Sequence, residues 1–101
     1  MAASKIEWFK EEVLPILVDY DVTFRYFEDG DFGSLSQFDF NSIELGGNVD
    51  FWGLNWIGIY LWSYKEERVL LNVLLDPDQE FSKKQAFKDL LALLTFDVDR
   101  T

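Results

Sequence analysis

The spacing of apolar residues predicts a helix near the start of the chain. Apolar side chains recur there every three or four positions, as they do on one face of a helix: Ile6, Phe9, Val13 and Leu17. Ser4 and Glu7 have the spacing of a capping box, which marks a helix start. Pro15 should kink or shorten this helix, because proline lacks the donor N–H. We therefore place the first helix at residues 4–18.

A second helix is predicted at the other end of the chain. Ser82 and Gln85 resemble another capping box. The positions expected to face the core are Phe87, Leu90, Leu91 and Leu94. The positions expected to face solvent are Lys83, Lys84 and Lys88.

Between the helices the pattern changes to the alternation and the β-branched and aromatic residues typical of strands. The expected strands cover residues 22–27, 37–45, 49–52, 56–64 and 68–75. Glycine- and aspartate-rich segments separate them, and Gly46-Gly47 is interpreted as a hairpin turn. Short connections favour neighbouring antiparallel strands. The predicted fold class is α+β: an antiparallel sheet of four to five strands (a meander), with the N- and C-terminal helices packed on one face. With 101 residues, we expect a single domain, 1–101.

The strand at residues 56–64 has two different faces. Because successive side chains point to opposite sides, one face carries Ile57, Ile59 and Leu61, which suits packing under the helices. The other face carries Trp56, Gly58, Tyr60, Trp62 and Tyr64. Exposed aromatic patches usually mark an interaction surface. The other possibility is a second core layer, covered by a helix or a loop.

Composition and charge restrict the possible partners. The chain has 19 acidic and 9 basic residues, for a net charge of −10. Nucleic acid and anionic membranes repel such a chain, so we expect neither as a partner. A basic protein is the natural complement, although an acidic surface can also serve solubility alone. The N-terminus has no apolar signal sequence and no stretch is long enough to span a membrane, so we expect a cytoplasmic protein.

Catalytic interpretations find little support in the sequence. The absence of histidine and cysteine excludes a Ser-His-Asp triad, a Cys-His pair and thiolate metal sites. Two carboxylate pairs, Asp29 with Asp31 and Asp76 with Asp78, lie in turns where aspartate is favoured for turn hydrogen bonds. We therefore expect no enzyme activity, no catalytic residues, no metal site and no cofactor.

Acidic and aromatic residues gather in one part of the chain. Between Tyr26 and Tyr64 there are six acidic and eleven aromatic residues but no basic residue. Acidic side chains speed the encounter with a basic partner, and buried aromatic side chains hold the complex together. The candidate partner-binding residues are Asp29, Asp31, Asp39, Glu44, Asp50, Trp52, Trp56, Tyr60 and Trp62.

Two runs of residues carry a resemblance to a known family. Residues 47–52, continued by 56–61, have a rhythm of aromatic residues and glycine, and an aliphatic strand at 70–75 follows. This segment, about residues 24–78, resembles small bacterial immunity proteins that accompany contact-dependent inhibition and related polymorphic toxins. The resemblance implies a cytoplasmic inhibitor that binds a cognate toxin domain, often a nuclease. No binding residue is carried over, because such families diverge at their interfaces.

The expected function is therefore that of an immunity protein. It would bind a cognate basic toxin, expected to be a nuclease, and cover its substrate cleft, which is basic because it holds phosphates. One alternative is a generic acidic interaction module or accessory subunit. Another is a small ligand-binding or enzymatic domain that uses carboxylates and an aromatic pocket. The sequence leaves the oligomeric state open.

Overall fold

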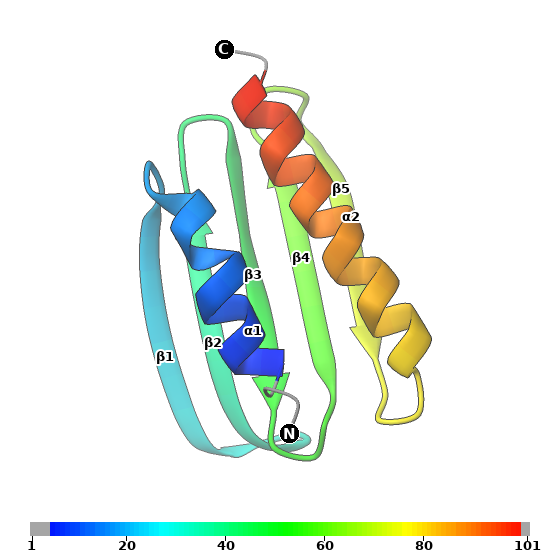
Figure 1. Ribbon diagram of the computed structural model, residues 1–101. Helices are drawn as coiled ribbons and strands as arrows, with labels where there is room; N and C mark the ends of the chain where they lie inside the picture. Colours follow the sequence, from blue (N-terminus) through cyan, green and yellow to red (C-terminus); the bar gives the residue numbers. More distant parts are fainter. Residues whose placement is uncertain (1–4, 100–101) are drawn as a thin grey trace.

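The computed structural model describes the backbone of residues 5–99 and the side chains of residues 5–95. The described residues form two helices, a short 3-10 helix and five strands (Figure 1). The elements in chain order are α1 (Lys5–Glu12), η1 (Leu14–Leu17), β1 (Asp21–Gly30), β2 (Gly33–Asn41), β3 (Leu45–Trp52), β4 (Ile57–Ser63), β5 (Arg68–Leu75) and α2 (Glu80–Asp99).

The five strands form one antiparallel sheet in the order β1-β2-β3-β4-β5. Each strand pairs with the one before it in the sequence, so the sheet is a meander. Both helices lie on the same face of this sheet (Figure 1). The predicted α+β fold class is therefore confirmed, with five strands and with a helix at each end of the described chain.

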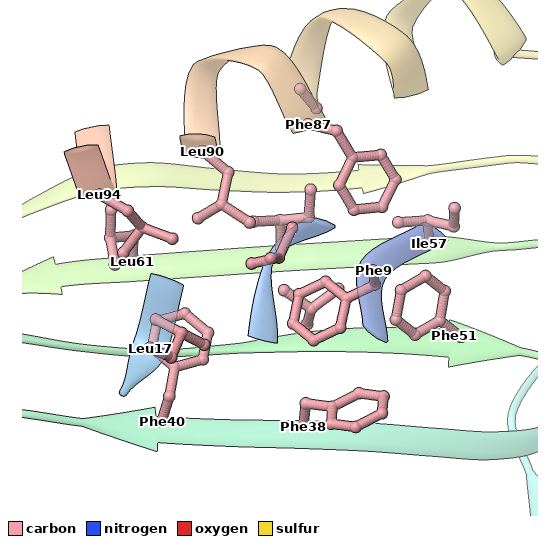
Figure 2. Close-up of a cluster of buried hydrophobic side chains, with 14 of the residues drawn as sticks. Phe9, Leu17, Phe38, Phe40, Phe51, Ile57, Leu61, Phe87, Leu90 and Leu94 are labelled. Carbon is pink, nitrogen blue, oxygen red and sulfur yellow. The ribbon is translucent and has the colours of Figure 1, made fainter. Parts of the chain in front are cut away.

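The hydrophobic core lies between the helices and the sheet. Figure 2 shows side chains of the helices and side chains of the sheet pointing toward one another. The helical side chains are Phe9 from α1, Leu17 from η1, and Phe87, Leu90 and Leu94 from α2. On β4, Ile57, Ile59 and Leu61 are buried against these helices, as the alternation predicted. The sheet supplies further aromatic side chains to the core, namely Phe38, Phe40 and Phe51.

Pro15 has the effect expected of it. The α-helix ends at Glu12, and the 3-10 helix that follows contains Pro15 near its first position. The predicted apolar stripe continues across both segments, because Phe9, Val13 and Leu17 are all buried. Ser4, the predicted cap of this helix, lies outside the described residues.

The hairpin predicted at Gly46-Gly47 is wrong. Both glycines lie inside β3, and the actual turn between β2 and β3 is at residues 42–44, where the Ser42 side chain and backbone bond with Leu45. A Cβ atom at Gly47 would lie 2.1 Å from the backbone oxygen of Tyr60. Glycine in a strand can mark such a close backbone approach rather than a turn.

The second capping box is also wrong. Helix α2 begins at Glu80, so Ser82 and Gln85 are inside the helix. The segment before it is held by the Asp76 backbone N–H donating to Gln79 Oε1 and the Asp78 N–H donating to Asp76 Oδ1. Asp76 and Asp78 thus serve a turn, as expected for aspartates there. Within residues 5–99, no helix is both long and apolar enough to cross a membrane.

Lys83 does not face solvent as predicted. Its side chain is completely buried, and Nζ donates a 2.7 Å hydrogen bond to the backbone oxygen of Asn55 in the β3–β4 turn. Nζ also lies 3.4 Å from Glu80 Oε1. Because Lys83 is four residues before Phe87 and seven before Leu90, it shares the inward stripe of α2. Lys84 and Lys88 are exposed, as predicted.

Candidate protein-binding face

The sheet face opposite the helices, here called the open face, carries most of the candidate residues. On β4, Gly58, Tyr60 and Trp62 point to this face, because they alternate with the buried Ile57, Ile59 and Leu61. Both helices lie on the other side, so no helix of the described chain covers the open face (Figure 1). Tyr60 and Trp62 are therefore half-buried surface residues, and the alternative of a second core layer under a helix is not what the structure shows.

The register between β3 and β4 brings four candidate residues onto this face. Asn48 lies opposite Tyr60, Gly46 opposite Trp62 and Asp50 opposite Gly58. Asp50 and Trp52 consequently share the open face with Tyr60 and Trp62. All four are half-buried.

Two glycines allow aromatic rings to lie against the sheet backbone. A Cβ atom at Gly58 would lie 3.2 Å from Cζ3 of Trp52, so the indole ring rests on this glycine. At Gly46 a Cβ atom would meet the Tyr64 hydroxyl, which donates a 2.6 Å hydrogen bond to Asn41 Oδ1. Large rings cover small residues on adjacent strands, which explains why Trp52 is only half exposed on an otherwise uncovered face.

An aromatic cluster closes one end of the open face. Phe32 stacks on Trp56 with ring centroids 4.0 Å apart and meets Trp52 edge-on at 5.3 Å. Two backbone bonds tie the β1–β2 and β3–β4 turns together, from Gly53 N–H to Ser34 O and from Leu54 N–H to Phe32 O. Phe32 was not among the candidates predicted from the sequence, although a lone aromatic residue in a turn rich in glycine and aspartate was a signal that could have pointed to it.

A polar network covers the part of the open face formed by β1, β2 and β3. Arg25 on β1 forms an ion pair with Asp39 on β2. Gln37 Nε2 donates a 2.9 Å hydrogen bond to Asp50 Oδ1, and Asn48 Nδ2 donates to the same oxygen at 3.2 Å. Arg25 Nη1 also donates to Gln37 Oε1 at 3.4 Å, so the network extends over three strands. These bonds hold the polar side chains in fixed positions, which lowers the entropic cost of binding a partner.

Arg25 also changes the charge distribution that the sequence indicated. It lies just outside the base-free stretch of residues 26–64, and strand pairing places it opposite Gln37, within that stretch. Its ion pair compensates Asp39, while Asp50 accepts hydrogen bonds only from neutral amides among the described contacts. The part of the face formed by β1 and β2 is thus less acidic than the sequence segment alone predicts.

The remaining acidic candidates lie at opposite ends of the sheet. Asp29 and Asp31 are exposed at the β1–β2 turn, beside the aromatic cluster of Phe32 and Trp56. Glu44 lies in the β2–β3 turn, where its backbone oxygen accepts a hydrogen bond from the Tyr64 N–H. The candidate residues therefore lie along the open face and at both ends of the sheet, and they do not form one compact acidic patch.

The open face has the chemistry of a recognition surface, with aromatic rings, amides and carboxylates in fixed positions. No group of three or more acidic side chains within the described part of the chain is arranged to hold a metal ion. Comparison of the chain with protein-family models, with curated proteins and with solved structures found no match.

Proposed function

We propose that this protein binds a basic protein domain on the open face and blocks it, as an immunity protein blocks its toxin. The observation that carries the proposal is the uncovered face itself: one whole side of a five-stranded sheet has Trp52, Tyr60 and Trp62 beside a fixed polar network. Large uncovered apolar surfaces on small proteins usually mark a binding site. Tyrosine and tryptophan are the residues that contribute most binding energy in protein interfaces.

The arrangement of basic residues supports a basic partner on this side. Five lysines lie on the two helices, away from the open face: Lys5, Lys10, Lys83, Lys84 and Lys88. Arg25, which does lie on the open face, is paired with Asp39. The two helices also carry seven acidic residues, so they are nearly balanced, whereas residues 20–79, which form the sheet and its turns, carry three basic and eleven acidic residues. Most of the net charge of −10 therefore lies in the sheet layer, which attracts a cationic partner.

The inhibitory role rests on the chemistry of the expected partner. A nuclease cleft is basic and bears groups that hold phosphates, so an acidic and aromatic surface can occupy it and exclude the substrate. The segment that resembles immunity proteins, about residues 24–78, spans the sheet that bears the open face. Inhibition by this route needs no catalytic group in the inhibitor.

The test uses the protein encoded directly upstream of this chain, because an immunity gene directly follows its toxin gene. We expect its C-terminal domain to be basic, to be toxic when produced alone and to form a stable complex with this protein. Growth rescue and calorimetry measure the two effects. Binding without rescue would support a generic interaction module, and the absence of both would overturn the proposal.

Trp62→Ala tests the face. We expect it to weaken binding by about 2–4 kcal/mol while the protein stays folded, since the ring contributes to the surface rather than to the core. Phe81→Ala is the matched control, because Phe81 is an exposed aromatic residue on α2 in the helical layer, and it should leave affinity unchanged. A Trp62→Ala protein that is folded and binds normally would exclude the open face as the interface.

A further inference from the structure

A groove between the two helices has no part in the proposed function. It has a volume of about 460 Å³, within the usual range for small-molecule sites. It is lined by Lys5, Trp8, Glu80, Lys83, Lys84, Phe87, Lys88 and Leu91. Figure 1 shows the two helices side by side on the face of the sheet opposite the open face.

The floor of the groove is apolar and partly aromatic. Trp8 from α1 and Phe87 from α2 contact each other with ring centroids 5.1 Å apart. Leu91 continues this surface one turn further along α2 and is only partly buried. An apolar body lying on these three side chains would remove their remaining exposed surface from water.

The rim of the groove is cationic, in contrast to the rest of the chain. Four of the nine basic residues line the groove, but Lys83 is buried with Nζ bonded to the Asn55 carbonyl, so the ammonium groups left for the rim are those of Lys5, Lys84 and Lys88. Glu80 is the single acidic residue of the lining. Glu80 is already engaged, since Oε2 lies 2.9 Å from Lys5 Nζ and Oε1 lies 3.4 Å from Lys83 Nζ. Lys84 and Lys88 have no carboxylate within 4.0 Å in the described part of the chain. These two ammonium groups are free to pair with an anion.

We propose that this groove binds a small amphiphilic carboxylate, such as a medium-chain fatty acid. The apolar body lies on Trp8, Phe87 and Leu91, and the carboxylate pairs with Lys84 and Lys88. The lysine stems extend the apolar contact while their ammonium groups remain at the rim. The mostly apolar lining favours a ligand with one anionic group over a polyanion, whose further charges would lose their hydration there.

Decanoate is the probe, titrated below its micellar concentration into the isotope-labelled protein. We expect saturable binding at one site, with shifts in the indole N–H signal of Trp8 and in the backbone signals of Phe87 and Leu91. The indole signals of Trp52 and Trp62, on the opposite face of the sheet, should stay in place. Decanol, which has the same chain without the charge, should bind about fivefold more weakly or worse.

A double variant separates recognition of the carboxylate in the groove from the general attraction of an anion to the lysines of the protein. Lys84→Gln with Lys88→Gln should weaken decanoate binding by about fivefold, the combined effect of two exposed ion pairs. Lys10→Gln with Lys65→Gln removes the same charge away from the groove and should have no such effect. The proposal fails if decanoate causes no saturable shift, or if decanol and the groove variant bind as decanoate and the unmodified protein do. The outcome of the decanoate experiment does not depend on the proposed function. The variant that tests that function, Trp62→Ala, changes the opposite face of the sheet and leaves the groove intact.

Discussion

At the scale of single residues, Lys83 joins α2 to the β3–β4 turn. Its stem is buried among the core side chains, and Nζ donates to the Asn55 backbone oxygen at 2.7 Å. Glu80, half-exposed beside it, balances the charge at 3.4 Å. A buried ammonium group is stable in a protein only when such partners replace its water shell. Lys83 is therefore a structural contact between helix and turn.

The first prediction concerns this contact. Lys83→Ala should lower the free energy of unfolding by about 1–3 kcal/mol, because it removes both a charge-assisted hydrogen bond and the packing of the stem. Lys84→Ala, which truncates the exposed neighbour, should change it by less than about 0.5 kcal/mol. Chemical denaturation of the two variants measures the difference. Equal stabilities would mean that the buried bond contributes nothing.

The second prediction concerns the pH dependence of Glu80. The hydrogen bond from Lys5, with a further one from Asn55, lowers the pKa of the Glu80 carboxyl from 4.5 to about 2. A lowered pKa stabilises the fold above the unfolded value of about 4.5, and this stabilisation is lost as the pH falls from there toward 2. The side chain is half-exposed, so solvent screening keeps the effect small.

A carbon-detected NMR titration of the carboxyl groups checks this pKa directly. We expect a midpoint near 2 for Glu80 and a return toward 4.5 in Lys5→Gln, while Lys10→Gln, on the same helix, leaves the midpoint in place. A Glu80 midpoint that is the same in both variants would show that the contact with Lys5 does not hold the carboxylate ionised.

At the scale of secondary-structure elements, the two glycines of β3 have different neighbours. A Cβ at Gly47 would meet the backbone oxygen of Tyr60 at 2.1 Å, and a strand backbone cannot move without disturbing its ladder. A Cβ at Gly46 would meet the ends of two side chains, Asn41 Oδ1 at 2.3 Å and the Tyr64 hydroxyl at 2.6 Å. These two side-chain ends lie on the open face and can rotate away.

The third prediction follows from this difference. Gly47→Ala should destabilise the protein by about 1–3 kcal/mol, the usual range for inserting a group where no space exists. Gly46→Ala should cost less and should mainly break the hydrogen bond between Tyr64 and Asn41. Denaturant midpoints of the two variants test the order. The reverse order would contradict the close approach of β3 and β4 at Gly47.

At the scale of the whole molecule, charge is divided between the two layers. The two helices carry five basic and seven acidic residues, whereas residues 20–79, which form the sheet and its turns, carry three basic and eleven acidic residues, with Asp29 and Asp31 exposed at one end of the sheet. Such a division orients an approaching basic protein toward the sheet side before contact. Screening by salt weakens this orientation beyond a distance of about 8–10 Å.

The fourth prediction concerns association with the basic partner of the proposed function. The association rate should fall as ionic strength rises, while the dissociation rate changes little. Asp29→Asn with Asp31→Asn should slow association, and Glu11→Gln, on α1 in the helical layer, should do so much less. Stopped-flow measurements at several salt concentrations give both rates. An association rate independent of salt would exclude electrostatic steering.

Much of the fold followed from local patterns. The strand at residues 68–75 was predicted with its observed bounds, because the charged turn at residues 65–67 precedes it and proline and aspartate at residues 76–78 end it. The burial of Ile57, Ile59 and Leu61 was predicted from the two-residue period alone. The turn at Gly46-Gly47 was wrong, since glycine permits a turn and a close approach of strands equally well. The position of a neighbouring strand decides between them.

The sequence by itself determined the α+β class, the order of the elements and which side of β4 faces the helices, because these depend on periodicity and on short connections. Only the tertiary structure decided which residues from different elements contact one another. It paired Arg25 with Asp39 across two strands, rested Trp52 on Gly58 and buried Lys83 against the Asn55 carbonyl. Each of these contacts joins residues from different elements. These contacts depend on strand register and on the position of the helices. The packing of the whole chain fixes both, so neither can be predicted from the local sequence.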